Sequence, residues 1–175
     1  MIITISGPPG SGKTTVGRLV AKTLGCPFKS TGESFRAIAD EREISLAKLG
    51  ELAEKDHSID VELDRRVIKS LVEPMVLEGR LAGHMCARSG VRAFKIWVDA
   101  PVEVRADRIA EREKKKPAAV KKAMLVREKS ECQRYRDIYG IDFCDTSVYD
   151  LVLDSRTESA EALAKFVVAE VTRRG

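Results

Sequence analysis

The sequence predicts an α/β fold in which helices cover both faces of a parallel sheet. Short runs rich in β-branched residues alternate with longer amphipathic stretches along the 175 residues, an order typical of this fold class. Several short runs are almost continuously apolar, as expected for strands that are buried on both faces. No repeat, low-complexity tract or linker divides the chain. We therefore expect residues 1–175 to form a single domain.

The expected strands are Ile2–Ser6, Cys26–Ser30, Pro74–Glu78, Phe94–Asp99 and Leu151–Asp154. A helix should run from about Lys13 to Leu24, because its apolar residues fall on one face and Gly25 supplies a C-terminal stop. Another should begin near Pro101, whose fixed φ suits a first helical turn.

Residues 31–73 lie between the second and third expected strands, which is more chain than a simple crossover needs. Ser45 and Ser58 are candidate N-caps for two helices in this region. We interpret Glu33–Leu71 as a helical insertion, and we expect it to help bind an acceptor.

Composition and charge exclude several classes of protein. The net charge is +4, and the basic excess is concentrated between Arg105 and Arg136, which favours a local anionic ligand over a nucleic-acid-binding face. No apolar run approaches the roughly 20 residues that cross a bilayer, and the N-terminus lacks the basic region of a signal peptide. The four cysteines form no CxxC pair, which fits a reducing compartment. We expect a cytoplasmic protein that binds neither membrane nor nucleic acid.

The clearest motif is G-x-x-x-x-G-K-[ST], which lies between an expected strand and an expected helix. Its residues are Gly7, Pro8, Pro9, Gly10, Ser11, Gly12, Lys13 and Thr14, followed by Thr15. Glycines let the backbone turn its N–H groups toward a phosphate, and the helix N-terminus adds a favourable dipole. Lys13 can reach the β- and γ-phosphates of a nucleoside triphosphate, and the Thr14 hydroxyl can bind Mg²⁺. The alternative is a chance glycine turn before a helix.

A phosphate loop alone does not separate kinases from GTPases and ATPases. The guanine-reading N-K-x-D motif of GTPases requires an asparagine, and this chain contains none. A motor ATPase would usually be longer. These observations favour a kinase that acts on a small acceptor.

Two further segments follow expected strands and carry arginines. Gly32 permits a close backbone approach, and Arg36 lies about one turn into the next helix, where it could bind a phosphate. Glu78 could orient Mg²⁺-bound water and Arg80 could hold an acceptor phosphate, because both stand at the carboxyl edge of the sheet. The alternatives are a solvated Arg36 and a Glu78–Arg80 ion pair.

Arg105, Arg108 and Arg112 share one face of the helix that follows Pro101. We interpret them as part of a mobile lid that brings positive charge to the transferring phosphoryl group and excludes water. The next three lysines, residues 114–116, are more simply a solvated face.

Arg127, Glu131 and Arg134 share a face of the next expected helix. Arg127 is a candidate to stabilise charge on the γ-phosphoryl group. Glu131 and Arg134 could hydrogen-bond the edge of a base, or they could form an i,i+3 surface pair.

Together these motifs resemble the nucleoside monophosphate kinases, and most closely the short cytidylate kinases of archaea. The segments that carry the resemblance are GPPGSGKTT (7–15), STGESFR (30–36), LEGRLAG (77–83), KIWVDAP (95–101), the arginine-rich lid (105–116) and REKSECQRYRDIYGID (127–142). The family implies a three-layer P-loop NTP hydrolase fold with strand order 2-3-1-4-5. It also implies a helical monophosphate-binding region at about 31–72, a lid at about 108–120, and transfer of a phosphoryl group from ATP, with Mg²⁺, to CMP or dCMP.

The resemblance also assigns roles to individual residues. Residues 7–15 would bind ATP, and Lys13, Arg108 and Arg127 would stabilise the transferred group. The implied CMP-binding residues are Thr31, Gly32, Arg36, Glu78, Gly79, Arg80, Glu131 and Arg134. In bacterial relatives an Asp and an Arg that match Glu131 and Arg134 read cytosine, and those relatives have Asp at position 78 and Ser at position 31.

The phosphate loop is also compatible with another acceptor or with another class of function. The acceptor could be AMP, UMP or shikimate instead of CMP. The chain could also be a nucleotide-dependent switch that acts through a partner, although a lid that excludes water serves transfer to an acceptor better. We expect a monomer.

Overall fold

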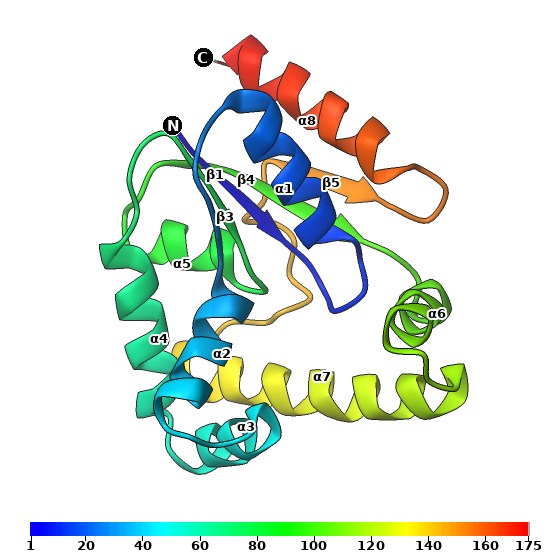
Figure 1. Ribbon diagram of the computed structural model, residues 1–175. Coiled ribbons are helices and arrows are strands. Elements are labelled where there is room, and N and C mark those ends of the chain that lie inside the picture. Colours follow the sequence, from blue (N-terminus) through cyan, green and yellow to red (C-terminus); the bar gives the residue numbers. More distant parts are fainter. Residues whose placement is uncertain (175) are drawn as a thin grey trace.

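A computed structural model describes residues 1–174 and contains the expected sheet (Figure 1). All neighbouring strands pair in parallel, in the order β2-β3-β1-β4-β5. The strands are β1 (Ile2–Ser6), β2 (Phe28–Ser30), β3 (Met75–Glu78), β4 (Ala93–Asp99) and β5 (Leu151–Asp154). The predicted fold class and strand order are confirmed, and only β2, β3 and β4 differ from prediction, by one or two residues at their starts.

Helices cover both faces of this sheet and extend beyond its carboxyl edge (Figure 1). They are α1 (Lys13–Leu24), α2 (Thr31–Glu41), α3 (Leu46–Lys55), α4 (Ser58–Lys69), α5 (Ala82–Arg88), α6 (Val102–Glu113), α7 (Pro117–Tyr139) and α8 (Ala160–Arg174). α1 and α8 share a buried core with Ile3, Ile5 and Val98 on one face of the sheet. On the other face, Trp97 packs with α5 and with aromatic residues that follow α7. Because strand side chains alternate, both faces of β4 are buried.

The helix boundaries follow local sequence, with one correction. Ser45 caps α3 by accepting a hydrogen bond from the Lys48 N–H at 3.1 Å. The prediction that Ser58 is an N-cap is wrong, because Ser58 is the first residue of α4 and His57 occupies the cap position. The Asp56 side chain accepts the Ser58 N–H at 3.0 Å, so the capping oxygen comes from two residues earlier.

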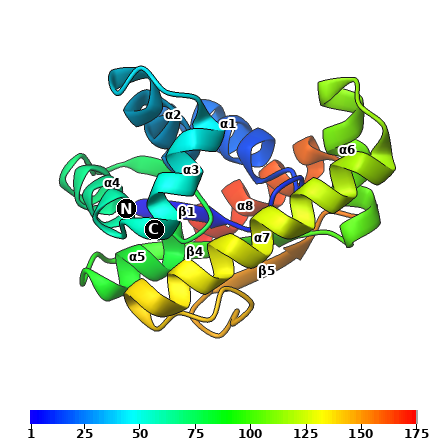
Figure 2. The same cartoon turned by 90° about the horizontal axis from the view of Figure 1, so that it is seen from below.

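The region between β2 and β3 forms the helices α2, α3 and α4, which pack together in one apolar cluster. α6 and α7 form a second helical unit at the far end of the sheet, and residues 114–116 separate them. Lys114 ends α6 in a left-handed conformation, and Pro117 begins α7. Seen from below, α7 crosses the molecule from α6 to the side of α4 and α5 (Figure 2). Within residues 1–174, no helix is long and apolar enough to cross a membrane.

Candidate active site

A large cleft lies at the carboxyl edge of the sheet. It measures about 1050 Å³ and is lined by the phosphate loop, the first turn of α2, α4, the end of β3, α6 and α7. Sites for one small ligand usually measure roughly 300–1000 Å³. The volume of this cleft therefore lies at the upper end of that range.

The phosphate loop occupies one end of the cleft, and residues 9–15 line it. Gly10 has φ +80, and a Cβ there would lie 2.6 Å from the Arg105 carbonyl oxygen. Only glycine fits such a position, because both the backbone conformation and the contact exclude a side chain. The hydroxyl of Ser11 is buried and has no hydrogen-bond partner among the described residues. The loop thus has the shape and the free polar groups of an anion site.

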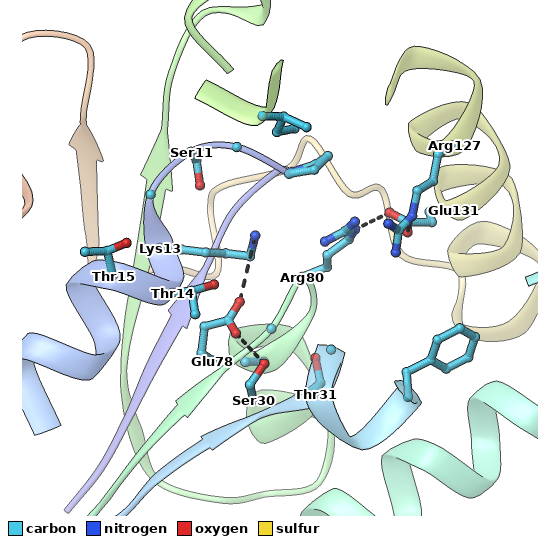
Figure 3. Close-up of a pocket in the computed structure, with 18 of the residues that line it drawn as sticks. Ser11, Lys13, Thr14, Thr15, Ser30, Thr31, Glu78, Arg80, Arg127 and Glu131 are labelled. Carbon is cyan, nitrogen blue, oxygen red and sulfur yellow. Dashed lines mark hydrogen bonds and ion pairs between the residues drawn. The ribbon is translucent and has the colours of Figure 1, made fainter. Parts of the chain in front are cut away.

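Lys13 is the cation of this loop and is only 6% exposed. Its Nζ donates to the Pro8 carbonyl oxygen at 3.1 Å and lies 3.8 Å from a Glu78 carboxylate oxygen. Burial, with some repulsion from Arg80, lowers the pKa of Lys13 to about 8, although Glu78 opposes the shift. Glu78 also accepts the Ser30 hydroxyl at 2.6 Å, and this hydrogen bond joins the ends of β2 and β3 (Figure 3).

Arg80 points from the end of β3 toward α7, where Glu131 pairs with it (Figure 3). Arg127 pairs with the other oxygen of Glu131 at 2.8 Å, so one carboxylate holds two guanidinium groups. Burial would raise the pKa of Glu131, but Arg80 and Arg127 hold it below its usual value. The alternative of a Glu78–Arg80 pair is not what the structure shows, since each residue has other partners.

The first turn of α2 places Thr31 and Gly32 on the cleft, and the exposed Arg36 also lines it. Ser30 caps this helix by accepting the Glu33 N–H at 3.4 Å. A Cβ on Gly79 would lie 2.1 Å from the Thr31 hydroxyl oxygen. The absence of a side chain at position 79 therefore allows β3 to approach this turn closely.

Arg134 and Glu131 are both buried, but they do not pair with each other. The Nε of Arg134 donates to Asp60 on α4 at 2.9 Å, and Asp60 is equally buried. The interpretation of Glu131 and Arg134 as an exposed i,i+3 pair is therefore wrong. Sequence reasoning missed Asp60, because nothing in a solvated-looking helix such as SIDVELDRR shows which carboxylate faces a residue 74 positions later.

Asp64 lies one turn after Asp60, lines the same cleft, and accepts a hydrogen bond from the Tyr139 hydroxyl. Burial raises the pKa of Asp64 to about 6. Its ordinary value is 3.8, so between pH about 4 and about 6 the folded protein binds more protons than the unfolded chain. The contribution of Asp64 to the free energy of unfolding therefore decreases as the pH rises through this window.

The variant Asp64→Asn should be more stable than the wild type at about pH 8, by roughly 1–3 kcal/mol, and nearly equal to it at about pH 4. The amide keeps an acceptor for Tyr139 and removes the cost of a buried charge. Urea unfolding at the two pH values measures the difference. An equal gain at both values would show that titration of this carboxyl is not the cause.

The three predicted lid arginines have different surroundings. Arg108 donates to the side chain and the carbonyl oxygen of Ser155, at 3.0 and 2.5 Å, and Ser155 in turn contacts the Ser11 carbonyl at 2.7 Å. Arg112 is exposed and pairs with its neighbour Glu113. Arg105 differs most from the expectation of a mobile lid residue, because it is buried against the phosphate loop. Ser155, which no motif marked, holds Arg108 beside the loop.

Comparison with known proteins relates this cleft to a family. A family model described as the cytidylate kinase-like family matches residues 2–157. A cytidylate kinase of Halobacterium salinarum is 46% identical over 173 residues, which is 98% of this chain and 89% of that protein. A cytidylate kinase of Methanosarcina barkeri is 50% identical, over 89% of this chain and 87% of its own. The match to a Methanothermobacter thermautotrophicus cytidylate kinase, at 43% identity, covers 93% and 99% of the two chains.

Solved structures match the fold at much lower sequence identity. A shikimate kinase from Acinetobacter baumannii has a TM-score of 0.63 at 20% identity, over 99% of this chain and 93% of that one. A gluconokinase from Sinorhizobium meliloti has a TM-score of 0.64 at 15% identity, over 98% and 91%. These two relate the architecture to that of P-loop kinases. The sequence matches show the family as well as the fold, since they cover most of both chains at 43–50% identity. The chain therefore belongs to the cytidylate kinase-like family.

Proposed function

We propose that this protein is a cytidylate kinase, which transfers the γ-phosphoryl group of ATP to CMP or dCMP and releases ADP with CDP or dCDP. The observation that carries the proposal is that one cleft joins the phosphate loop to the buried charges of α4 and α7. Membership of the family supports the choice of a cytidine nucleotide over the alternatives AMP, UMP and shikimate.

The charges in the cleft suit in-line transfer between two bound phosphates. Residues 7–15 would hold the triphosphate, and Arg36 and Arg80 would bind the phosphate of the acceptor. Lys13, Arg108 and Arg127 would share the charge of a loose transition state. Positioning and electrostatic stabilisation supply most of the acceleration of such reactions, so no histidine base is needed.

Mg²⁺ would bind at the same place, together with ATP. The hydroxyl of Thr14 and the carboxylate of Glu78 both line the cleft beside Lys13 (Figure 3). Such oxygen donors suit this ion, which usually keeps several waters and binds substrate phosphates. The bound ion would neutralise charge on the phosphates, while Thr14 and Glu78 would fix its position, Glu78 through a bound water.

The Asp60–Arg134 pair would read the base. The exocyclic amine of cytosine needs an acceptor and its ring nitrogen and carbonyl need donors, and a carboxylate beside a guanidinium offers both. Burial raises the pKa of Asp60, although Arg134 opposes this shift. Glu131 lies one turn away on α7 with its oxygens already engaged by Arg80 and Arg127, so it is better placed near the phosphate or ribose than at the base edge.

The variant Asp60→Asn should lower kcat/KM for CMP by about tenfold to a hundredfold. It should affect UMP less, because an amide can turn its N–H₂ toward the carbonyl that uracil has in place of the amine. The ratio of kcat/KM for CMP and UMP is the measurement. The control is Glu62→Gln, a change on the same helix at a partly exposed residue that pairs with Arg42 and Arg66. An unchanged ratio would remove Asp60 from base recognition.

Production of ADP from ATP and Mg²⁺ tests the proposed function directly. The acceptors compared are CMP, dCMP, UMP, AMP and shikimate, and one reaction contains no acceptor. We expect turnover to be fastest with CMP or dCMP. Preference for another acceptor would retain the kinase chemistry and reject the cytidine assignment, whereas equal ADP production without acceptor would reject a kinase.

A further inference from the structure

Arg105 is a buried cation that does not line the cleft. It is 5% exposed, and its guanidinium contacts three separate parts of the chain. Nε donates to the Ala100 carbonyl oxygen at 3.0 Å, just after β4. Nη1 donates to the Pro9 carbonyl oxygen of the phosphate loop at 3.1 Å. The two terminal nitrogens also reach the Glu128 carboxylate on α7, at 2.5 and 3.4 Å.

These contacts join Arg105 to the Pro9–Gly10 segment of the phosphate loop. Pro8 and Pro9 have no N–H groups, so their carbonyl oxygens are the polar groups by which this segment can be fixed. Lys13 donates to the first of them and Arg105 to the second. Gly10 also lies against the backbone and Cβ of Arg105, because a Cβ on this glycine would lie within 3.0 Å of those atoms. Arg105 is therefore in direct contact with two successive residues of the loop, Pro9 and Gly10.

Glu128 connects this anchor to the acceptor side of the cleft. It lies on α7 next to Arg127 and one turn before Glu131, whose carboxylate pairs with both Arg127 and Arg80. α7 is a continuous helix of 23 residues, so displacement of its acceptor-facing turns is transmitted to Glu128. The salt bridge to Arg105 is bidentate and largely buried, with side-chain exposures of 7% and 16%, and a planar fork of this kind restricts relative movement.

We propose that Arg105 and Glu128 are positioning residues that fix the phosphate loop relative to α7, so that the donor and acceptor phosphates are held in line for transfer. Neither residue needs to touch a substrate. Their contribution is to alignment, and a small misplacement of reacting groups can cost up to about a hundredfold in rate. The part of this proposal that concerns the rate rests on the proposed function, because it assumes transfer of a phosphoryl group from ATP to CMP.

The test compares Glu128→Gln with the matched control Glu103→Gln. Glu103 is on α6 and pairs with Lys121 on α7, so it also bridges the two helices, but its side chain is 70% exposed and its salt bridge involves no residue of the phosphate loop. In Glu128→Gln we expect kcat with CMP to fall about tenfold, while KM for ATP and CMP stays within about twofold. Glu103→Gln should leave kcat unchanged. Arg105→Lys, which keeps the charge and loses the fork, should resemble Glu128→Gln.

A purely structural role would give a different pattern. It would lower the midpoint of thermal unfolding and leave kcat unchanged at temperatures where the variant is folded, and this result would overturn the proposal. An equal loss of kcat in Glu103→Gln would also overturn it, because general loosening of the helix pair would then suffice. If Glu128→Gln folds poorly, Glu128→Asp provides the same comparison with the charge retained and the reach shortened.

Hydrogen exchange separates this inference from the proposed function. The amides of residues 10–13 should exchange faster in Glu128→Gln than in the wild type or Glu103→Gln, with no nucleotide present. Unchanged exchange would overturn the positional claim, whatever the acceptor. Absence of CMP-dependent turnover in the wild type would instead reject the proposed function, and faster exchange in Glu128→Gln would still support the anchor.

Discussion

Replacing Lys13 with methionine is expected to reduce kcat with CMP by about 10³-fold and to leave the fold intact. Lys13 lines the cleft, and its Nζ lies between the Pro8 carbonyl and Glu78. Charge that develops on the transferred group would lose its nearest buried cation, and such a cation is worth more in a desolvated site than in water. Steady-state ADP production measures the loss.

The free energy of unfolding of the variant shows whether its loss of activity is caused by loss of structure. Methionine fills much of the same space, and it removes an ammonium group whose pKa burial lowers to about 8. Below pH about 8 the gain from removing this buried charge opposes the cost of leaving Glu78 buried without its cation, so Lys13→Met should stay folded with a free energy of unfolding close to that of the wild type. A variant that is inactive because it has lost its structure would contradict the prediction, as would a stable variant with near-normal kcat.

The lowered pKa of Lys13 also predicts that protons are taken up when an ATP analogue binds. In the free protein, raising the pH through about 8 removes the proton from Lys13, whereas a bound triphosphate favours the charged form. Binding of an ATP analogue should therefore take up protons above pH about 8, and its affinity should decline there. Calorimetry in buffers of different ionisation enthalpy measures this uptake. It should be absent in Lys13→Met, and uptake that persists would assign the titration to another group.

Most of the fold is predictable from this sequence because its patterns are local. A glycine loop after an apolar strand predicts the first βα unit, and nearly continuous apolar runs predict strands covered on both faces. The predicted helix start was less accurate where the capping oxygen comes from a residue other than the N-cap. His57 takes the N-cap position of α4, and the Asp56 side chain supplies the acceptor for the Ser58 N–H. Serine is a favourable N-cap residue, so the sequence pointed to Ser58 instead.

Only those site residues that belong to sequence motifs could be predicted. Strand ends brought Glu78 and Arg80 beside the phosphate loop, as parallel strands require. Partners from distant helices were not predictable, because spacing on one helix does not show what faces it. Asp60 and Glu128 both looked like ordinary solvated carboxylates on charged helices, and each is instead paired with a buried arginine.

Replacing Arg80 with methionine should lower kcat/KM for CMP by about 10³-fold, and it should also destabilise the protein by about 3 kcal/mol. Arg80 would be the main ligand of the acceptor phosphate, and lysine should not restore activity because it lacks the bidentate fork. The loss of stability arises from Glu131, which is buried and would keep only Arg127, a side chain that is 54% exposed. Burial alone would lower the pKa of Arg80, but Glu131 raises it, so the two charges stabilise each other.

The double variant Arg80→Met, Glu131→Leu separates the two effects. Removing one member of a buried ion pair is costly, whereas replacing both with apolar residues is often nearly neutral. The double variant should therefore regain most of the free energy of unfolding that Arg80→Met loses, because no buried carboxylate remains uncompensated. Its kcat/KM should stay about 10³-fold low, because the acceptor phosphate still lacks its guanidinium. Recovery of activity together with stability would show that Arg80 acts by supporting α7, and that acceptor binding depends on another residue.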